Sequence, residues 1–307
     1  MKIKNIKTWK ADLANTKPYT IAFKTIDSVS NAFVEITLEN GITGIGAGNP
    51  SEYVTGEYFD STIAALDENN LDFLVGRDIR EANQLLFEVL QKFPKNPAAR
   101  AALDIAIYDA LTKHLGIPLV KFLGQKIKSL PTSNTIGIKN VEETLKEAKE
   151  YDERGFKILK VKLGKDLEED IERLVKLREH FGKRMVIRID ANQGYTSEQT
   201  KQFYKRTANL DIELIEQPLP AKAIDEMKAL PDDIKIRIAA DESLLSPADA
   251  LKLVTPPSAA GIFNIKLMKS GIAEALDIAA AARAAGLGLM IGGMVESTLA
   301  MSMSACF

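Results

Sequence analysis

The sequence has few of the residues that build disulfide frameworks or soft-metal sites. It holds a single cysteine, Cys306, so no intramolecular disulfide can form, and a cysteine-rich metal site is excluded. Its only two histidines, His114 and His180, lie in segments with helical patterns, which disfavours a zinc centre. A cytoplasmic protein without disulfides fits this composition best.

Long apolar runs and an excess of positive charge are also missing. No stretch approaches the roughly 18 apolar residues of a membrane helix, and the opening residues alternate like a strand rather than forming the core of a signal peptide. A net charge of -2 and a pI near 5.9 provide no electrostatic footprint for nucleic acid or an anionic membrane. We therefore expect neither nucleic acid nor a membrane as a partner, while homo-oligomerisation stays open.

The first part of the chain predicts a small unit of strands and helices. Three strand-like runs and one helix that is apolar nearly all round are expected, at residues 2–13, 31–38 and 42–48 for the strands and 98–115 for the helix. The turn Glu39-Asn40-Gly41 predicts a hairpin, and Gly116 is a typical helix stop. Because the helix is apolar on all sides, we expect it to lie buried between two layers.

After Pro131 the pattern changes to short apolar runs that alternate with amphipathic stretches, as in repeated βα units. Seven strands are expected, at residues 132–138, 158–163, 185–191, 212–217, 234–240, 261–267 and 286–291. Their almost purely apolar composition is typical of parallel strands that are covered on both faces. Seven units nearly close a (β/α)8 TIM barrel, which we favour over an open doubly wound sheet because no G-x-G-x-x-G turn follows a strand. The eighth strand is not reached before Phe307, so we expect either that the barrel is incomplete there or that another segment closes the gap.

Acidic residues interrupt the strands at their C-terminal ends, where barrel enzymes hold their active sites. The third, fourth and fifth strands end in Asp190, Glu216 and Asp241, at spacings of 26 and 25 residues. Singly, each could be a solvated loop carboxylate or a helix N-cap. Three that converge would repel one another unless a cation neutralised them, and all-oxygen ligands select a hard ion. The pattern therefore predicts a site for Mg²⁺, or for Mn²⁺.

Lysines interrupt the two strands on either side of the acidic ones. Lys160 and Lys162 share one face of the second strand because side chains alternate along a strand, and Lys266 lies on the sixth strand. Two neighbouring ammonium groups in a partly dry cavity should depress each other's pKa, which converts a lysine into a usable base. The alternatives are a wet strand face for the pair and a snorkelling side chain for Lys266.

Taken together, these residues resemble the enolase superfamily and, within it, the muconate-lactonising subgroup. The segments around Asp190, Glu216 and Lys266 are similar to those of the dipeptide epimerases, of the L-Ala-D/L-Glu epimerase type. The segment Ala102-Leu103-Asp104-Ile105-Ala106 resembles the helix that joins that family's two domains. The resemblance implies an α+β capping domain over residues 1–125 and a (β/α) barrel domain over residues 126–307.

The resemblance also implies an activity and roles for the interrupting residues. The expected protein is an isomerase, a Mg²⁺-dependent epimerase of dipeptides that removes the proton α to a carboxylate and passes through an enediolate. The three carboxylates would be the metal ligands. Lys162 and Lys266 would be the acid/base pair on opposite faces of the substrate, and Lys160 would tune Lys162.

Residues expected to contact the substrate come from several parts of the chain. Residues 21–25 resemble the family's specificity loop, where Lys24 would pair with an anionic substrate group or be a solvated lysine. Thr135, Glu296 and Ser297, together with Lys160, should line the cavity. One departure from the family pattern is Ser270-Gly271-Ile272, where two successive glycines are usual.

Three other activities of the same subgroup would use the same lysines and acids: muconate cycloisomerase, o-succinylbenzoate synthase and N-acylamino acid racemase. An Asp-x-Asp pair on an eighth strand would favour the epimerase among them. The alternative outside enzymology is a catalytically silent barrel that serves as a binding protein. Intact lysines on both sides of the acids disfavour it.

Overall fold

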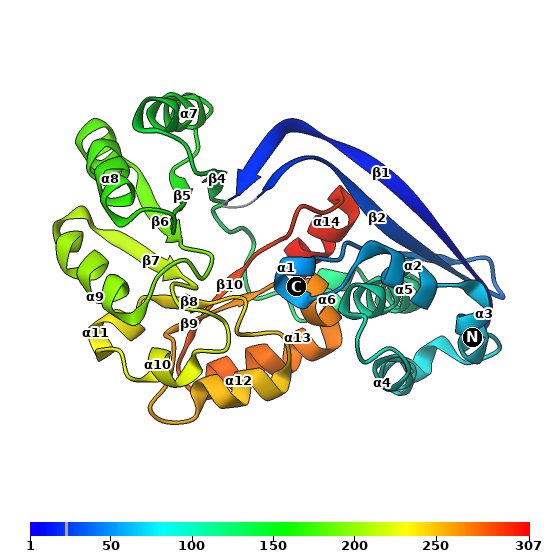
Figure 1. Cartoon of the computed structure of the whole chain (residues 1–307). Coiled ribbons are helices and arrows are strands. Elements are labelled where there is room, and N and C mark those ends of the chain that lie inside the picture. The colour runs from blue at the N-terminus through cyan, green and yellow to red at the C-terminus, as the bar shows by residue number, and fades with distance from the viewer. Residues whose placement is uncertain (22–23) are drawn as a thin grey trace.

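The computed structural model describes residues 1–21 and 24–307, with the side chains of residues 16–26 outside that description. It contains a three-stranded antiparallel sheet and a seven-stranded parallel sheet, and Figure 1 shows the two on different sides of the molecule. No helix in the described ranges has both the length and the apolar character that crossing a membrane requires.

The antiparallel sheet has the order β1-β2-β3, with β1 at Ile3–Ile21, β2 at Lys24–Leu38 and β3 at Thr43–Gly48. The first two strands are much longer than the predicted runs 2–13 and 31–38. Pairing continues past Leu13, which lies opposite Val29, and resumes at Tyr19 opposite Ile26 after a register shift. Polar residues in this stretch hide it from a pattern of alternating apolar side chains, because the ladder is made by the backbone.

Short helices and one long helix follow this sheet. They are α1 (Glu52–Thr55), α2 (Phe59–Ala65), α3 (Glu68–Leu71), η1 (Asp72–Leu74), η2 (Ile79–Glu81), α4 (Ala82–Lys92), α5 (Pro97–Leu115) and α6 (Leu119–Phe122). The long helix α5 has Pro97 in its first turn and ends at Gly116, whose φ of 69° is left-handed. Its buried residues cover every side, as predicted, because it packs against both β3 and α13 (Leu267–Ala284).

Glycines on one face of β3 allow close packing of α5 against this strand. Gly44, Gly46 and Gly48 alternate along β3, so they share one face of the strand. A Cβ atom at Gly46 would lie 1.9 Å from the carbonyl oxygen of Ala102, and one at Gly48 would lie 2.3 Å from that of Ala98. The helix backbone thus lies directly against the strand, which fixes the position of α5 between the two sheets.

The parallel sheet has the order β10-β9-β8-β7-β6-β5-β4 and curls into part of a barrel (Figure 1). Its strands are β4 (Asn134–Ile136), β5 (Ile158–Lys162), β6 (Val186–Asp190), β7 (Ile212–Glu216), β8 (Ile238–Ala240), β9 (Ile262–Ile265) and β10 (Gly288–Ile291). The predicted barrel architecture with seven parallel strands is confirmed. The start of the fifth strand was predicted too early, because Pro231 opens a short helix before it.

Helices alternate with these strands. They are α7 (Val141–Glu153), α8 (Leu167–Phe181), η3 (Gly182–Arg184), α9 (Ser197–Arg206), η4 (Ala208–Leu210), α10 (Ile224–Lys228), α11 (Asp232–Lys235), α12 (Pro247–Val254), α13 and α14 (Thr298–Cys306). Figure 1 shows α7, α8 and α9 on the outer side of the strands they connect. The boundary between domains at residues 125 and 126 falls between α6 and β4, and it stays a prediction.

Candidate active site

The ends of β5, β6 and β7 bring the predicted residues into register. Lys162 lies opposite Asp190 in the pairing of β5 with β6, and Asp190 lies opposite Glu216 in the pairing of β6 with β7. Asp241 follows directly after β8. Asp190, Glu216 and Asp241 are all at most 1% exposed, so three carboxylates are buried at neighbouring strand ends. Lys266 follows β9, which places one lysine strand on each side of the acids.

On the β5 side, two lysines meet the first two carboxylates. The Lys160 Nζ atom lies 2.8 Å from Asp190 Oδ2 and 2.7 Å from Glu216 Oε1, so it bridges two strand ends. The Lys162 Nζ atom donates to Asp190 Oδ2 at 2.6 Å and to Asn192 Oδ1 at 2.7 Å. Both lysines therefore point to the same side of β5, as the alternation of side chains predicts.

On the β9 side, two lysines meet the third carboxylate. The Lys266 Nζ atom donates to Asp241 Oδ2 at 2.6 Å. The Lys269 Nζ atom donates to Asp241 Oδ1 at 2.9 Å and to the backbone oxygens of Asp241 and Asn264, each at 2.9 Å. Both lysine side chains are buried, so the carboxylate of Asp241 is held between two ammonium groups.

Burial and charge set the protonation of these acids. Burial raises the pKa of Glu216 to about 8, and the neighbouring negative charge of Asp190 adds to the effect. Burial acts in the same direction on Asp190 and Asp241, but the adjacent ammonium groups hold the pKa of both below the ordinary range. The cluster is therefore a set of mutually coupled carboxylates that needs positive charge to stay ionised.

The lysine pKa values differ from the expected mutual depression. Burial lowers the pKa of Lys160, yet the charges of Asp190 and Glu216 outweigh it and raise the pKa well above its ordinary value. The pKa of Lys266 is likewise raised, because Asp241 outweighs its burial. The expectation was wrong for Lys160, since three carboxylates act on this ammonium group more strongly than one neighbouring lysine does.

The donor set fits a hard divalent cation. Within residues 1–21 and 24–307, no three acidic, histidine or cysteine side chains lie close enough together to hold an ion. Lysine ammonium groups lie between the carboxylates instead. Among the described residues, Glu216 Oε2 is buried and finds no hydrogen-bond partner. A buried carboxylate oxygen without a partner is costly, and oxygen-only ligands are those that Mg²⁺ prefers. The residues therefore suit Mg²⁺ chemically.

Three left-handed residues, Asn192, Gln193 and Gln217, follow the acidic strand ends. Asn192 has a φ of 42° and Gln217 a φ of 34°, a region that non-glycine residues rarely adopt. Gln217 Oε1 accepts the backbone N–H of Asp241 at 2.9 Å and the Ser243 hydroxyl at 2.9 Å. Such strain is typical of functional sites. The hydrogen bonds of Gln217 tie the loop after β7 to the one after β8.

The residues expected to bind substrate lie in different surroundings. Thr135 is half-buried on β4 opposite Lys160. Glu296 Oε1 accepts the backbone N–H of Met294 at 2.8 Å, while its Oε2 is buried without a partner in the described ranges. Ser297 is an N-cap of α14, and its N–H donates to Asn31 Oδ1 of β2 at 3.2 Å. The side chain of Lys24 falls outside the described residues.

Sequence reasoning missed four polar residues that contact the cluster: Asn192, Glu242, Asn264 and Lys269. Asn264 Nδ2 donates to Glu216 Oε1 at 3.1 Å, and Asn192 Nδ2 donates to Glu242 Oε1 at 3.2 Å. Each lies within three residues of a predicted site residue, so a search for buried polar neighbours of the strand ends would have found them. Burial raises the pKa of Glu242 to about 7, with Asp241 adding to the effect.

Family models match most of the chain. Residues 5–124 match the mandelate racemase / muconate lactonizing enzyme N-terminal domain, and residues 143–307 match the enolase C-terminal domain-like family.

Individual relatives agree with these matches. The L-Lys-D/L-Arg epimerase of Desulforapulum autotrophicum is 50% identical over 98% of this chain and 85% of that protein. The L-Ala-D/L-Glu epimerase of Bacillus subtilis is 33% identical over 100% of this chain and 85% of that protein. A dipeptide epimerase from Methylococcus capsulatus, solved with Mg and the dipeptide L-Arg-D-Lys, is 48% identical, with a TM-score of 0.97 over 100% of this chain and 87% of that one. The chain thus belongs to the enolase superfamily, with the mandelate racemase and muconate lactonizing enzymes, as its strand-end residues predict.

Proposed function

We propose that this protein is a Mg²⁺-dependent epimerase of dipeptides, which removes the proton α to a carboxylate and forms an enediolate. The observation that carries the proposal is the placement of Lys162 and Lys266 on β5 and after β9, with the three acidic strand ends between them. An epimerase needs proton-transfer groups on both faces of one carbon atom, beside positive charge that stabilises the carbanion. The relatives named as epimerases support the same reaction class.

Asp190, Glu216 and Asp241 would hold the metal. Mg²⁺ supplies, when bound, positive charge that stabilises negative charge developing on the substrate carboxylate. Mn²⁺ shares the preference for oxygen ligands and would fit the same three residues. Lysine ammonium groups now neutralise these carboxylates, so a bound cation would free the lysines for proton transfer.

The lysines perform the proton steps. One lysine, as the neutral amine, takes the α-proton, and the electrons of the broken C–H bond delocalise into the carboxylate to give the enediolate. The other lysine, as the ammonium, donates its proton to the opposite face of the same carbon, which inverts the configuration. Lys162 and Lys266 carry these roles, and Lys160 lies beside Lys162 on the same face of β5.

The substrate class is a dipeptide with basic side chains. Two relatives that share about half of their residues with this chain are named L-Lys-D/L-Arg epimerase. Glu296 adds support, because its Oε1 accepts from the backbone N–H of Met294, while its buried Oε2 has no hydrogen-bond partner among the described residues and could accept from a cation. A basic substrate does not need the anion-binding role expected of Lys24. Thr135, Lys160 and Ser297 stay candidates for lining the cavity.

The test follows α-proton exchange in D₂O with Mg²⁺ present. L-Lys-L-Arg, L-Arg-L-Lys, L-Ala-L-Glu and an N-acylated lysine are each incubated with the protein, and deuterium uptake is measured by mass spectrometry alongside chiral analysis. We expect exchange and epimerisation of the basic dipeptides. Preference for the acylated lysine would favour the racemase, and absence of exchange in every compound would defeat the proposal. The variant Glu296→Gln should lose selectivity for basic over neutral dipeptides.

A further inference from the structure

The helix that carries the β9-side lysine is broken near its start. Within α13, Gly271 has φ 72° and ψ −173°, values that no helical residue adopts. A φ this positive favours glycine. The break separates a single turn, residues 267–270, from the rest of the helix. Lys266 lies directly before this turn, and Lys269 lies within it.

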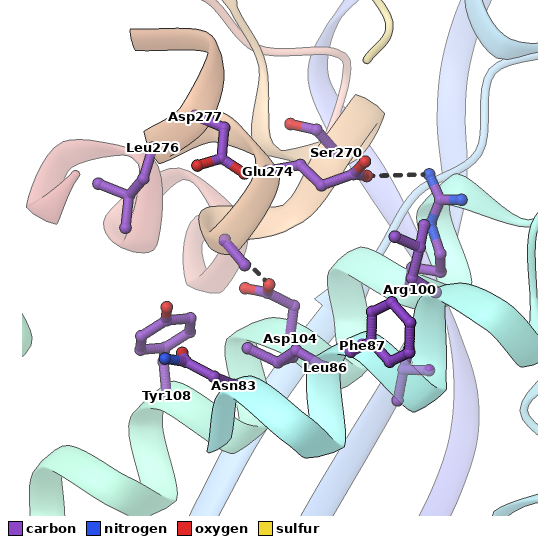
Figure 2. Close-up of a pocket in the computed structure, with 13 residues that line it drawn as sticks. Asn83, Leu86, Phe87, Arg100, Asp104, Tyr108, Ser270, Glu274, Leu276 and Asp277 are labelled. Carbon is purple, nitrogen blue, oxygen red and sulfur yellow. Dashed lines mark hydrogen bonds and ion pairs between the residues drawn. The ribbon is translucent and has the colours of Figure 1, made fainter. Parts of the chain in front are cut away.

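Asp104 of α5 holds the far side of the break. Its Oδ1 accepts the N–H of Ile272 at 2.8 Å, and its Oδ2 accepts the N–H of Ala273 at 3.1 Å. Figure 2 shows this carboxylate reaching from α5 to the start of the second part of α13. Asp104 thus acts as an N-cap for the second part of α13, although it lies on α5, 168 residues from Ile272 in the sequence. Negative charge is favourable at the N-terminal end of a helix.

The contact between Asp104 and the break is close on every side. Asp104 is only 4% exposed, and a Cβ atom added to Gly271 would lie 2.8 Å from both its Cγ and its Oδ2. Neither Gly271 nor the carboxylate can therefore shift without displacing the other. The position of the break is set by α5, which packs directly against the glycines of β3.

Lys269 holds the near side of the break. Its ammonium donates to the side chain and backbone of Asp241 and to the backbone oxygen of Asn264. The same carboxylate of Asp241 accepts from Lys266. The turn of residues 267–270 thus lies between two contacts, with Asp104 on one side and Asp241 on the other, and Lys266 lies directly before it.

Asp104 also borders a cavity of about 360 Å³ between α4, α5 and α13. Arg100 and Glu274 form an ion pair of 3.4 Å across it, and Figure 2 shows their side chains meeting beside Asp104. Charges of both signs line this space, and each oxygen of Asp104 already accepts a backbone N–H. The carboxylate therefore serves the helix break rather than a ligand.

We propose that Asp104 is a positioning residue that orients Lys266 for proton transfer through the break at Gly271. The inference rests on the proposed function, because it concerns one of the two faces of the epimerisation. It assigns a role in the chemistry to a residue of the N-terminal part of the chain that touches neither substrate nor metal. Its effect should be confined to one face, because Lys162 is held by Asp190 and Asn192 instead.

The test compares Asp104→Asn with a matched control, Asp109→Asn. Asp109 lies on the same helix, and its Oδ2 also accepts a backbone N–H, from Ile45 at 2.9 Å. Ile45 belongs to β3 of the antiparallel sheet, so this contact does not involve α13. Exchange of the α-proton in D₂O is measured for each epimer of the dipeptide separately. The Lys162→Ala and Lys266→Ala variants first identify which epimer gives its proton to which lysine.

We expect Asp104→Asn to slow exchange of the Lys266-dependent epimer about 10- to 100-fold, since small displacements of a reacting group are costly. Exchange of the Lys162-dependent epimer should change by less than about 3-fold, with the dipeptide KM preserved and Asp109→Asn unaffected on both faces. Equal slowing of both epimers, or no slowing of either, would overturn the inference.

A second variant covers the case in which Asp104→Asn fails to fold. Gly271→Ala perturbs the same break from the other side, since its Cβ atom would press on Asp104. It should slow α-proton exchange of the Lys266-dependent epimer only, and equal slowing of both epimers would again contradict the inference. If the native protein exchanges no dipeptide at all, the proposed function fails as well. If the native protein exchanges both epimers and the variants slow both equally, the positioning role alone is rejected.

Discussion

The two lysines that flank the acidic strand ends are held in different ways. Lys162 belongs to β5, a strand with hydrogen-bonded neighbours on both edges, and its ammonium contacts the next strand directly. Lys266 lies between β9 and a broken helix, and its surroundings depend on Lys269 and on Asp104 from α5. Lys162 is thus held within the sheet and by the loop after β6, whereas Lys266 lies where the two parts of the chain pack against each other.

This difference predicts which substitutions should affect each lysine. The sheet is a cooperative ladder, so single side-chain changes outside the site hardly move Lys162. The turn before Gly271 is short and has a left-handed residue at its end, so it keeps its shape only through the clamps on either side. Changes that loosen the packing of α5 on α13 should therefore separate the two faces of the reaction.

The largest expected effect comes from removing either lysine. Lys266→Ala should abolish epimerisation in both directions, while Lys162 still exchanges the α-proton of one epimer with D₂O. Lys162→Ala should show the mirror preference, provided that Lys160 does not act as the base. Losses of about 10²-fold or more are expected for the missing proton transfer, measured by mass spectrometry of each epimer. Exchange of both epimers by either variant, with metal bound, would refute the assignment of two bases.

The exposed Lys165, in the loop after β5, provides the control for charge removal. Lys165→Ala removes a lysine near the site without touching the carboxylates, so both epimers should exchange at native rates. A loss in this variant would indicate that net charge near the barrel mouth, rather than a specific base, sets the rate.

Much of this comparison could be predicted from the sequence, because the strand periodicity alone sets the lysines and acids on successive strands. Lys162, Asp190 and Glu216 end apolar strands, and parallel pairing then places them side by side. The break at Gly271 and its contact with Asp104 could not be predicted. They join residues 168 positions apart, and neither the pattern of apolar residues nor local turn chemistry records such a contact.

The full length of the antiparallel pair β1 and β2 could not be predicted, for a related reason. Its residues between 14 and 30 carry a mixture of polar and apolar side chains, so no period of two stands out. Backbone pairing with the neighbouring strand forms the ladder regardless of side chains. The role of Lys24, at the start of β2, stays a prediction.

The second prediction concerns the carboxylate that serves both faces equally. Glu216→Gln removes the negative charge of the acid on the middle of the three strands, and Mg²⁺ affinity measured by calorimetry should fall by at least about 10-fold. Exchange on both faces should fall together. Glu213→Gln is the control, because Glu213 is an exposed residue on the same strand that pairs with Arg188. Unchanged Mg²⁺ affinity in Glu216→Gln would remove this residue from the metal site.

The third prediction is the counterpart of the Asp104 variant on the other face. Asn192 Oδ1 accepts from the Lys162 ammonium at 2.7 Å, and hydrogen bonds to charged groups contribute about 1.5–3 kcal/mol. Asn192→Ala should slow exchange of the Lys162-dependent epimer about 10-fold and leave the Lys266-dependent epimer nearly unchanged. Equal effects on the two epimers would show that the loops after β6 and β9 are not independent.

The last prediction concerns stability rather than rate, and it involves the contact of Asp104 with the helix break. Burial raises the pKa of this carboxyl to about 7, whereas its ordinary value is 3.8. The charged groups around it are Arg100 on its own helix and Glu274 and Asp277 on α13, with Tyr108 also facing it. A folded-state pKa above the unfolded one means that the folded state holds the proton more tightly. Its contribution to the free energy of unfolding is therefore complete below about pH 4 and is lost as the pH rises through 7.

Urea unfolding of the native protein and of Asp104→Asn at several pH values between 4 and 9 isolates this contribution. The difference in unfolding free energy between them should change by up to about 1.4 kcal/mol per pH unit. The native protein should lose stability relative to Asp104→Asn as the pH rises. Above pH 8 the difference should become constant, because the carboxyl is then ionised in both folded and unfolded chains. Parallel stability curves across the whole range would show that Asp104 is already ionised in the folded protein. The clamp on the Lys266 side would then be a full carboxylate at every working pH, and its two accepted N–H groups would hold the break equally well in acid and in neutral solution.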